Sequence, residues 1–310
     1  MKRDHAGAKT QGTASKIVSI IIPTYNRGLL LKRALESVVD QTYPHWEVLV
    51  VDNHSEDETD KIVNDFNDSR ISLYKIHNNG IIASSRNLGI KAAQGEWVAF
   101  LDSDDWWGPQ KLAESVRALE QGADVVYHDL YLVRAEHQRW YWIKVKTFQL
   151  HAPVSQDLIE RGASIINSSV VTRKSLIEKV GGFPEEKVLV GWEDYYCWLR
   201  VAKYTDRFVR LNKTLGYYWE GGENFTLPER TLRNLQEFQQ RYLQKRSGNL
   251  PASFCYAMGR TLYQLGRYNE AKQYLLDVIG SHPLFEIKLK AVVTLAIIGL
   301  REIQNVFKAR

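Results

Sequence analysis

The stretch Gly95-Glu96-Trp97-Val98-Ala99-Phe100-Leu101-Asp102-Ser103-Asp104-Asp105 joins an apolar run directly to an acidic turn. The apolar run has the length and composition of a buried β-strand, and the proline of Gly108-Pro109 indicates a helix start just beyond the turn. A strand followed by a polar turn and a helix is typical of α/β proteins with a parallel sheet. The pattern therefore predicts that the acidic turn lies at the carboxyl end of a central strand.

Upstream of this stretch, the chain alternates between short apolar runs and amphipathic segments. The runs have the composition of strands, and the amphipathic segments carry apolar residues at helical spacing. Strands are predicted at 18–22, 46–51, 71–76 and 96–101, and helices at 29–39, 62–66 and 82–93. This alternation predicts parallel strands joined by crossover helices.

Downstream of the acidic turn, the pattern is less regular. Strands are predicted at 124–133, 140–148, 163–171 and 208–219, and a helix at 192–203. From Leu227 onward only helical periodicity remains. We therefore predict a disordered tail over residues 1–16, a three-layer α/β domain over 17–225 and a small all-α region over 226–310.

The helical region contains one recognisable repeat, at about residues 252–285. Its small, apolar and helix-ending residues fall at the spacings of a single tetratricopeptide-like helix–turn–helix: Gly259, Leu262, Gly266, Tyr268, Ala271, Leu275 and Pro283. A lone repeat cannot bury its own apolar face, so it must pack on neighbouring helices or on the α/β domain. We favour this packing interpretation over a partner-binding surface.

The composition is that of a folded protein of ordinary charge. The 310 residues are 44% hydrophobic and 25% charged, and the formal net charge is +5. A charge of this size does not indicate a nucleic-acid partner. Cys197 and Cys255 lie far apart and outside any metal-binding spacing, which argues against a disulfide framework and a structural zinc site and favours a reducing compartment.

Two apolar patterns bear on cellular location. Residues 1–15 contain no apolar core of the kind that a secretory signal needs, and the apolar stretch 291–300 is shorter than the ~20 residues that span a bilayer. We therefore predict a cytoplasmic protein. The segment 284–301 combines apolar residues with flanking lysines and an arginine, which suits a helix on the inner face of the plasma membrane or a helix packed on the repeat. Packing is the favoured alternative.

Polar side chains follow three of the predicted strands at the point where each strand ends, in segments 23–27, 52–53 and 102–105. Open parallel sheets bind ligands at this edge. Because carboxylates repel phosphates, an acidic cluster beside a nucleotide predicts a divalent cation between them, and oxygen ligands suit Mn²⁺ or Mg²⁺. The alternative is that Ser103 or Asp105 caps the helix that starts near Pro109.

The turn after the first strand argues against two nucleotide-binding classes. The sequence there is Pro23-Thr24-Tyr25-Asn26, which contains no glycine. A dinucleotide-binding domain needs GxGxxG at this position, and a nucleotidyltransferase needs a Gly-rich phosphate loop there. Neither class fits this sequence.

Six segments in order resemble the successive signatures of the family 2 glycosyltransferases. They are Val18-Ser19-Ile20-Ile21-Ile22-Pro23-Thr24-Tyr25-Asn26, Val50-Val51-Asp52-Asn53-His54-Ser55 with Asp57, Arg86-Asn87-Leu88-Gly89, Gly95 to Asp105, Gly181-Gly182-Phe183, and Glu193-Asp194. Any one of them is a weak signal, but the six in order within an α/β pattern are a strong one. The resemblance covers about residues 17–225.

The resemblance implies a GT-A fold and inverting transfer of a sugar from a nucleoside diphosphate donor. It places six residues on the donor side: Thr24, Asn26, Asp52, Arg86, Asp102 and Ser103. Among these, Asp52 is expected to accept a hydrogen bond from a uracil ring N–H, Asp102 to hold the ribose and Arg86 to lie near the base and diphosphate. Asp104 is the expected ligand of a divalent cation, Mn²⁺ or Mg²⁺. Asp194 is the expected catalytic base.

The chemistry of inversion agrees with these roles. An in-line displacement needs a base on the face opposite the leaving group and charge stabilisation at the diphosphate. Asp194 lies at the start of a predicted helix, whose N-terminus is expected to keep the carboxylate ionised. The alternative is that Glu193 and Asp194 only enrich a first helical turn in acid.

Aromatic residues surround both acidic segments. Because aromatic faces stack on sugar rings, Trp106, Trp192 and the neighbouring Glu193 are candidates for the acceptor side. Helical spacing places Tyr195 and Trp198 in the core instead.

One position departs from the family pattern. Many members have a histidine after the last strand of the catalytic domain that completes the metal site, and this chain has Tyr217-Tyr218-Trp219-Glu220 there. Glu220 could supply an oxygen ligand in its place. The expected metal site therefore lacks the family's histidine ligand.

The sequence as a whole predicts a sugar transferase of cell-surface polysaccharide or glycolipid assembly with a UDP-sugar donor. The expected partners are the nucleotide-sugar donor and a glycan or lipid-linked acceptor, with no nucleic acid. The alternative is a non-catalytic scaffold that senses a nucleotide sugar and acts through its helical region. Together, Asp102, Asp104 and Asp194 argue against the scaffold, because a scaffold needs no complete set of catalytic acids.

Overall fold

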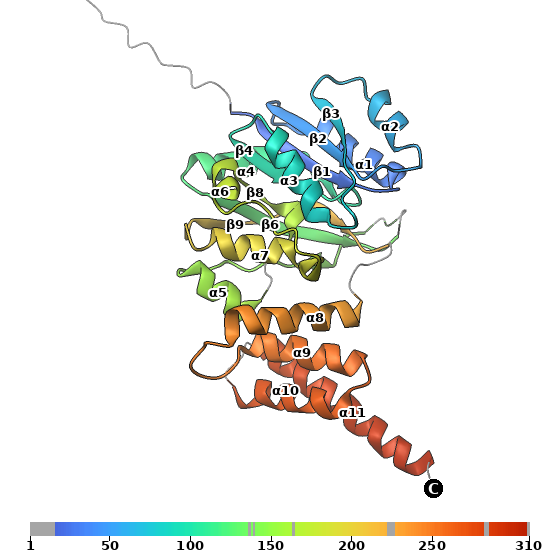
Figure 1. Cartoon of the computed structure of the whole chain (residues 1–310), viewed down its shortest axis with the longest axis vertical. Helices are drawn as coiled ribbons and strands as arrows, with labels where there is room; N and C mark the ends of the chain where they lie inside the picture. Colours follow the sequence, from blue (N-terminus) through green and yellow to red (C-terminus); the bar gives the residue numbers. More distant parts are fainter. Residues whose placement is uncertain are drawn as a thin grey trace, which may run out of the picture.

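A computed structural model describes residues 16–308 except 136, 137, 139, 163, 164, 222–226 and 282–284. In this part of the chain, a twisted sheet covered by helices on both faces is followed by a stack of helices (Figure 1). The N-terminal end of the tail predicted over 1–16 and the predicted 225/226 boundary lie outside the described residues.

The sheet combines parallel and antiparallel strands. Its strands are β1 Val18–Thr24, β2 Trp46–Asp52, β3 Ile71–Lys75, β4 Trp97–Phe100, β5 Trp106–Trp107, β6 Val125–Val133, β7 Lys144–Val145, β8 Val171–Arg173 and β9 Phe208–Trp219. Their order is β3-β2-β1-β4-β8-β6-β9-β5, and β7 pairs with β6. The first four strands in this order are parallel, and β8 is antiparallel to both β4 and β6. The parallel half, predicted from the alternating pattern, carries the strand ends of interest.

Helices fill the remaining layers and form the C-terminal stack. The α-helices are α1 Gly28–Val39, α2 Thr59–Asp65, α3 Ile82–Ala92, α4 Lys111–Glu120, α5 Val154–Arg161, α6 Lys174–Lys179, α7 Glu193–Val201, α8 Pro228–Phe238, α9 Ala252–Gln264, α10 Tyr268–Gly280 and α11 Phe285–Lys308. Short 3₁₀ segments occur at Asn167–Ser169 and Lys187–Leu189, and a π-helical turn at Gln239–Leu243 follows α8.

Two apolar cores lie on the two faces of the sheet. On one face, Leu31 and Leu35 of α1 and Leu112 of α4 pack against β1, β2 and β4. On the other face, Ile90 of α3 and Trp198 of α7 pack against residues such as Phe100. Because adjacent strand residues point to opposite faces, both cores draw on the same strands, which explains why β1 and β4 are apolar at nearly every position. The predicted three-layer α/β architecture is therefore confirmed.

The helical region shares one of these cores. The apolar cluster that contains α7 continues without interruption through α8, α9 and α10 to Ala291 and Ile298 of α11. At the junction, aromatic rings of Tyr196, Phe238 and Phe254 lie within 6.3 Å of a neighbour, centroid to centroid. The predicted all-α region is present, and it rests on the α/β part through buried aromatic side chains.

Helices α9 and α10 meet at a glycine. A Cβ atom at Gly259 would lie 2.7 Å from the side chain of Leu275, so only glycine allows this separation. The turn between the helices holds Gly266 at φ +74°, a conformation that side chains disfavour.

Among the described residues, no helix combines the length and the apolar character that crossing a bilayer needs.

Two predicted strands are much shorter than expected. The strand predicted at 140–148 is reduced to β7, and that predicted at 163–171 consists of a 3₁₀ turn that leads into β8, with residues 163 and 164 outside the described part. In the segment 140–148, Thr147 donates its N–H and its hydroxyl to the Asp129 carboxylate. This side chain takes the place of a backbone carbonyl of a neighbouring strand. The aromatic run before it is exposed. An apolar run predicts a strand only when it is buried.

Candidate active site

The polar segments that follow β1, β2 and β4 meet at one edge of the sheet. Thr24 and Asp52 are register partners at the ends of β1 and β2, and Asp102 follows β4, which pairs with β1 on its other side. Parallel strands bring their carboxyl ends together, and this edge is where open α/β sheets bind ligands. The three segments predicted from sequence are thus neighbours.

Asp52 and Thr24 form the buried part of this edge. The Asp52 carboxylate accepts hydrogen bonds from the Ser55 N–H at 3.0 Å and from Lys75 Nζ at 2.6 Å. The hydroxyl of Thr24 is also buried, and among the described residues it has no hydrogen-bond partner. An orphaned hydroxyl costs free energy unless a ligand satisfies it, so Thr24 fits a binding role.

Asn26 organises the two loops above this edge. Its N–H donates to Ser55 Oγ at 2.8 Å, and its Oδ1 accepts the N–H of Glu56 at 2.8 Å. Its φ of +49° is a left-handed conformation that asparagine tolerates better than most residues. Asn26 therefore joins the loop after β1 to the loop after β2.

The acidic turn holds three carboxylates with different partners. Asp102 Oδ1 accepts from Arg86 at 2.7 Å, and Asp104 pairs with Arg27. Asp105 is buried and accepts the Trp219 N–H at 2.9 Å. Burial and the charge of Asp102 raise the pKa of Asp104, and burial together with Asp104 and Asp102 raises that of Asp105 well above its ordinary value. The turn therefore concentrates negative charge that its arginines only partly offset.

The structure decides against the helix-cap alternative. Helix α4 begins at Lys111, its N-cap is Gln110, and no side chain caps it. Asp105 is instead bonded to Trp219, and the buried Ser103 lies one residue after Asp102. The acidic turn is not explained by capping.

Arg86 of α3 links the acidic turn to α7. Its Nη2 donates to Asp102 at 2.7 Å, and its Nη1 donates to Glu193 Oε1 at 2.7 Å. Burial disfavours the charged guanidinium, but the carboxylates of Asp102, Glu193 and Asp194 outweigh it and raise the pKa of Arg86. Two segments distant in sequence are thereby fixed to one another by a single charged group.

Glu193 faces Arg86. It is buried, and its second oxygen accepts the Gly191 N–H at 2.6 Å. The acceptor-side placement predicted for Glu193 stays a prediction, and both carboxylate oxygens are engaged inside the protein.

Asp194 lies in the first turn of α7 beside this pair. Burial raises its pKa to about 7, the charge of Glu193 adds to the shift, and Arg86 opposes it. The helix N-terminus, from which the sequence predicts an ionised carboxylate, is worth about 0.3–1 kcal/mol. Desolvation and a neighbouring acid outweigh that effect here. A carboxyl group that titrates near neutral pH is suited to exchange a proton with a hydroxyl.

The two candidate tryptophans both have protein neighbours. The ring of Trp106 stacks on Tyr217 with centroids 4.9 Å apart, and the Arg33 guanidinium lies 3.7 Å from its centroid. Trp192 packs edge-on against Tyr195 and Phe238. The prediction that Tyr195 and Trp198 belong to the core is confirmed, since their exposed fractions are 6% and 1%.

The chemistry of the acidic turn fits a divalent cation in part. Its carboxylates are hard oxygen ligands whose mutual repulsion a cation would relieve, which agrees with the raised pKa of Asp104. Among the described residues, however, no three acidic, histidine or cysteine side chains form a ready metal site. Glu220 is paired with Arg134. Any cation held here must take most of its ligands from substrate phosphates and water.

Several residues at this edge of the sheet were not predicted from the sequence. Arg27 and Lys75 bind Asp104 and Asp52, and Arg33 donates to the Asp104 carbonyl at 2.8 Å. Ser168 accepts the Asp102 N–H at 3.1 Å and donates its hydroxyl to Asp105. Arg27 adjoins the Thr24 segment, which was a usable signal. Nothing local marks Ser168, because its role depends on a 3₁₀ turn that packs against β4.

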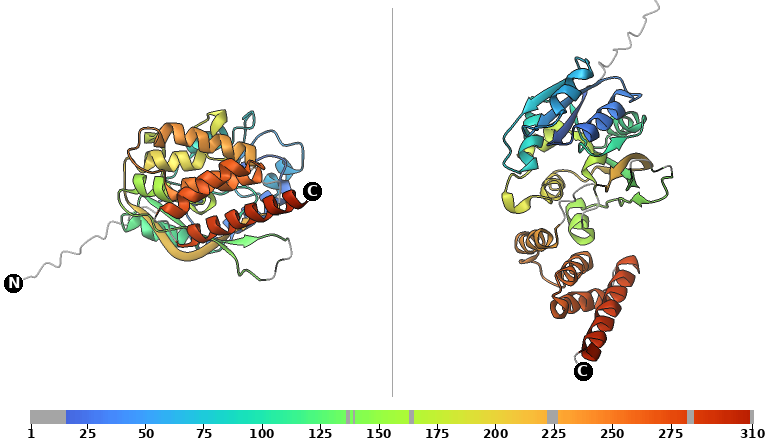
Figure 2. Two further views of the ribbon diagram at one scale, coloured as in Figure 1. Left: turned by 90° about the horizontal axis from the view of Figure 1, so that it is seen from below. Right: turned by 90° about the vertical axis from the view of Figure 1, so that its right-hand side faces the viewer.

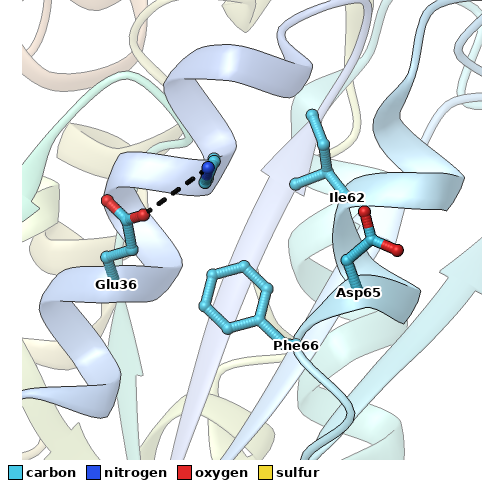
Figure 3. A pocket seen from close by; sticks show the side chains of 5 residues that line it. Glu36, Ile62, Asp65 and Phe66 are labelled. Carbon is cyan, nitrogen blue, oxygen red and sulfur yellow. Dashed lines mark ion pairs between the residues drawn. The ribbon is translucent and has the colours of Figure 1, made fainter.

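A surface hollow of ≈ 270 Å³ lies elsewhere, between α1 and α2 (Figure 3). It is lined by Lys32, Glu36, Ile62, Asp65 and Phe66. Its one drawn ion pair, Lys32–Glu36, spans 4.0 Å at the surface. These side chains come from the facing sides of the two helices and from Phe66 just after α2, and they do not include any of the strand-end residues.

Comparisons with known proteins agree with this geometry. The family model described as "Glycosyl transferase family 2" matches residues 19–181. The UDP-Glc:alpha-D-GlcNAc-diphosphoundecaprenol beta-1,3-glucosyltransferase WfgD of Escherichia coli is 32% identical over 188 residues, which are 60% of this chain and 70% of that protein.

Two solved structures share the fold. The crystal structure of S. aureus TarS 1-349 in complex with UDP-GlcNAc superposes with a TM-score of 0.59 at 19% identity, over 93% of this chain and 92% of that one. The mannosyltransferase PcManGT from Pyrobaculum calidifontis, in complex with GDP-Man and Mn²⁺, gives a TM-score of 0.56 at 21% identity, over 94% and 81% of the two chains.

Proposed function

We propose a specific reaction for this chain, which belongs to glycosyl transferase family 2 and is a glycosyltransferase. It transfers a sugar from a UDP-sugar to a hydroxyl of a glycan or lipid-linked acceptor, with inversion at the anomeric carbon. The observation that carries the proposal is the convergence of Thr24, Asp52, Asp102 and Arg86 at one sheet edge, next to Asp194. The activity named for the relative WfgD, with a UDP-sugar and a diphosphoundecaprenol acceptor, agrees with it.

Donor binding uses the buried half of the edge. The Asp52 carboxylate can accept the uracil N–H, and the unpartnered Thr24 hydroxyl is available to the nucleoside. Asn26 holds the two loops that frame this position. Asp102 and Ser103 lie one strand away, where the ribose of the same donor extends. Lys75 keeps a positive charge at Asp52 when no ligand is present.

The diphosphate lies at the acidic turn. Asp104 would hold a divalent cation, Mn²⁺ or Mg²⁺, which would supply positive charge for the leaving diphosphate. Arg27 and Arg86 supply positive charge on either side of the turn. Arg27 pairs with one carboxylate oxygen of Asp104, Oδ2, and leaves Oδ1 available to a cation. Glu220 stays with Arg134 and takes no part.

Asp194 removes the proton from the acceptor hydroxyl. The raised pKa supports this role, because a base that titrates near 7 can take a proton at neutral pH and release it afterwards. Glu193 and Arg86 fix the start of α7, so the base is held relative to the donor. Trp106, Trp192 and Glu193 border the acceptor side.

We also propose the organisation of the rest of the chain. Residues 17–225 form the catalytic domain, and residues 226–310 form a packing region whose α9 and α10 are one tetratricopeptide-like repeat. The close approach at Gly259 supports the repeat. The protein acts in the cytoplasm, at the inner face of the plasma membrane.

The test is transfer and donor hydrolysis across a panel of nucleotide sugars with Mn²⁺ or Mg²⁺. We expect turnover with at least one UDP-sugar, a β-linked product from an α-linked donor, and a rise in melting temperature with UDP plus cation. The proposal fails if no UDP-sugar turns over and UDP with metal leaves the melting temperature unchanged.

A further inference from the structure

Helix α11 has two apolar faces. One face packs on α9 and α10 through residues that include Ala291 and Ile298, which are fully buried. The opposite face exposes six large apolar side chains: Phe285, Leu289, Val292, Val293, Ile297 and Leu300, with exposed fractions between 39% and 79%. At 100° per residue these six fall within one arc on the side away from the core. A helix that only packs on a core needs one apolar face.

Basic residues border the exposed arc. Lys288 falls on one side of it and Lys290 on the other, and both are exposed. Arg301 lies on the same side as Lys290, but its guanidinium donates to the Tyr268 hydroxyl at 3.0 Å. An apolar strip between basic side chains is the composition of helices that lie in the plane of an anionic membrane, because lysine and arginine reach up to the headgroups. Glu286, in the first turn of the helix, is an exposed acidic side chain that falls within the arc.

The tip of the β6–β7 hairpin has a related composition. Trp140 and Trp142 are 70% and 80% exposed, and their rings stack with centroids 6.0 Å apart. Ile143 is also exposed, and the exposed Lys144 and Lys146 follow. Tryptophan is enriched where protein meets the headgroup layer, since it has an apolar ring and a polar N–H. Two neighbouring exposed tryptophans have no explanation in the packing of this fold.

The hairpin and α11 lie on the same side of the molecule. In the right-hand view of Figure 2 both project toward the right, at different levels along the long axis, and the view from below places both away from α8. Both can therefore face the same surface. Scattered apolar residues are ordinary on a protein surface, but two apolar and basic patches on one side are not.

We propose that the outer face of α11 and the Trp140–Lys146 tip together bind an anionic lipid bilayer. The proposal rests on the lipid-linked acceptor of the proposed function, because such an acceptor is reached at a membrane surface. The basic residues beside both apolar patches favour an anionic lipid surface over a second copy of this chain. Basic borders complement phosphatidylglycerol headgroups and would repel the identical borders of a second copy of this chain.

The experiment is flotation of the full-length chain with vesicles of phosphatidylcholine alone or with about 30 mol% phosphatidylglycerol. We expect binding only to the anionic vesicles, weakened at high salt. The double variants Leu289→Glu/Val293→Glu and Trp140→Ala/Trp142→Ala should each lower the bound fraction at least about fivefold. Val39→Glu, which changes an exposed valine of α1, is the matched control and should bind like the wild type.

Two readouts keep the outcome separate from the proposed function. Hydrolysis of the UDP-sugar in the absence of vesicles reports the catalytic site alone and should be unchanged in both double variants. Sedimentation velocity without lipid reports self-association. The lipid proposal is overturned if the wild type ignores anionic vesicles, if both double variants bind as well as the wild type, or if Leu289→Glu/Val293→Glu converts a wild-type dimer to a monomer.

Discussion

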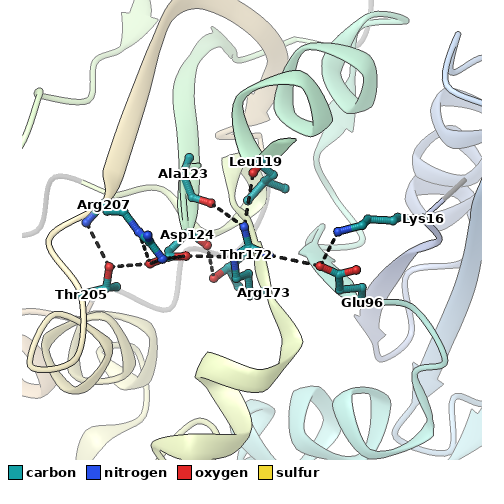
Figure 4. A network of polar contacts seen from close by, with 9 residues as sticks. All are labelled: Lys16, Glu96, Leu119, Ala123, Asp124, Thr172, Arg173, Thr205 and Arg207. Atoms are coloured by element: carbon teal, nitrogen blue, oxygen red, sulfur yellow. Dashed lines mark hydrogen bonds and ion pairs between the residues drawn. The ribbon is translucent and has the colours of Figure 1, made fainter. Parts of the chain in front are cut away.

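Acidic side chains that are buried or half-buried lie at opposite edges of the same sheet. At the amino ends of β6 and β9, Asp124 accepts from Arg173 Nε at 2.9 Å, from Arg207 at 2.8 Å and from the Thr205 hydroxyl at 2.5 Å (Figure 4). Burial alone would raise the pKa of Asp124, but these donors lower it. At the carboxyl ends of β1, β2 and β4, burial and neighbouring acids raise the pKa of Asp104, Asp105 and Asp194.

The difference teaches how to tell a structural carboxylate from a functional one. Asp124 has its hydrogen-bonding capacity filled by the protein, so its ionised form stabilises the fold. Asp194 is ionised at a cost to the fold, and a proton, cation or substrate is needed to relieve that cost. Desolvation acts on both carboxyl groups, and their hydrogen-bond and charge partners decide whether the pKa falls or rises.

The substitution Asp194→Asn gives the strongest test of the difference between Asp124 and Asp194. We expect the transfer rate to fall by about 10²–10⁴-fold with little change in the KM for the donor, since the amide cannot accept the acceptor proton. Steady-state kinetics with the UDP-sugar identified by the panel would measure this. Asp65→Asn, an exposed acid of α2, should keep wild-type activity. Wild-type transfer by Asp194→Asn would instead favour the scaffold hypothesis.

The same variant also tests the pKa. The folded pKa of Asp194, about 7, lies above its ordinary value of 3.8, so its carboxyl group loses stabilisation as the pH rises from 3.8 to 7. Wild-type kcat/KM should therefore rise through pH 7 as the base ionises. Asp194→Asn should melt higher than the wild type at pH 8, by about 2–4 °C per kcal/mol, and melt alike at pH 4. An equal shift at both pH values would contradict the assignment.

Asp104→Asn tests the cation at the same edge. We expect a loss of roughly 10²–10³-fold in kcat/KM at saturating Mn²⁺, because the diphosphate loses electrostatic stabilisation. A Mn²⁺ titration of activity should show weaker apparent metal affinity, and EDTA should abolish wild-type turnover. Asp68→Asn, which removes a local pair with Arg70, serves as the control. Metal-independent activity in the wild type would rule out this role for Asp104.

Asp124→Asn is the matched change at the opposite edge. It removes the carboxylate partner of Arg207 and one of the two carboxylate partners of Arg173, which keeps Glu96. We expect the free energy of unfolding to fall by about 1–3 kcal/mol. Because the folded pKa of Asp124 is lowered, this contribution is present above pH 3.8 and is lost as the pH falls through the folded value. Denaturant titration at pH 7 measures it, and kcat of the folded fraction should not change. A large loss of kcat with normal stability would contradict the structural role of Asp124.

Ser168→Ala should have the smallest effect. Removing its hydroxyl takes one bond from Asp105 and one from the Asp102 N–H, worth about 1 kcal/mol, or roughly fivefold in kcat/KM. Ser169→Ala truncates the next residue of the same 3₁₀ turn, whose hydroxyl bonds only the Ile166 carbonyl among the described contacts. If both variants lose activity equally, the effect belongs to the turn and not to the acidic carboxylates.

Much of the candidate site was predictable because its residue types are local properties. The strand that ends at Asp102, the turn after Thr24 and the acidic start of α7 are each marked by a few consecutive residues. The failures share one cause. The sequence predicts a strand at the exposed Trp140 run and an ionised Asp194 at its helix N-terminus. Both features depend on which residues lie nearby in space, and local sequence does not contain that information.

The sequence by itself determined the α/β order, the family and the identity of the acids at the strand ends, since periodicity and short motifs depend on neighbouring residues along the chain. Only the tertiary structure decided that Arg86 joins Asp102 to Glu193, that Ser168 supports Asp105 and that Asp194 titrates near 7. These facts depend on strand order and burial, which bring distant charges together in a medium that screens them poorly. The direction of a pKa shift is therefore a property of the fold.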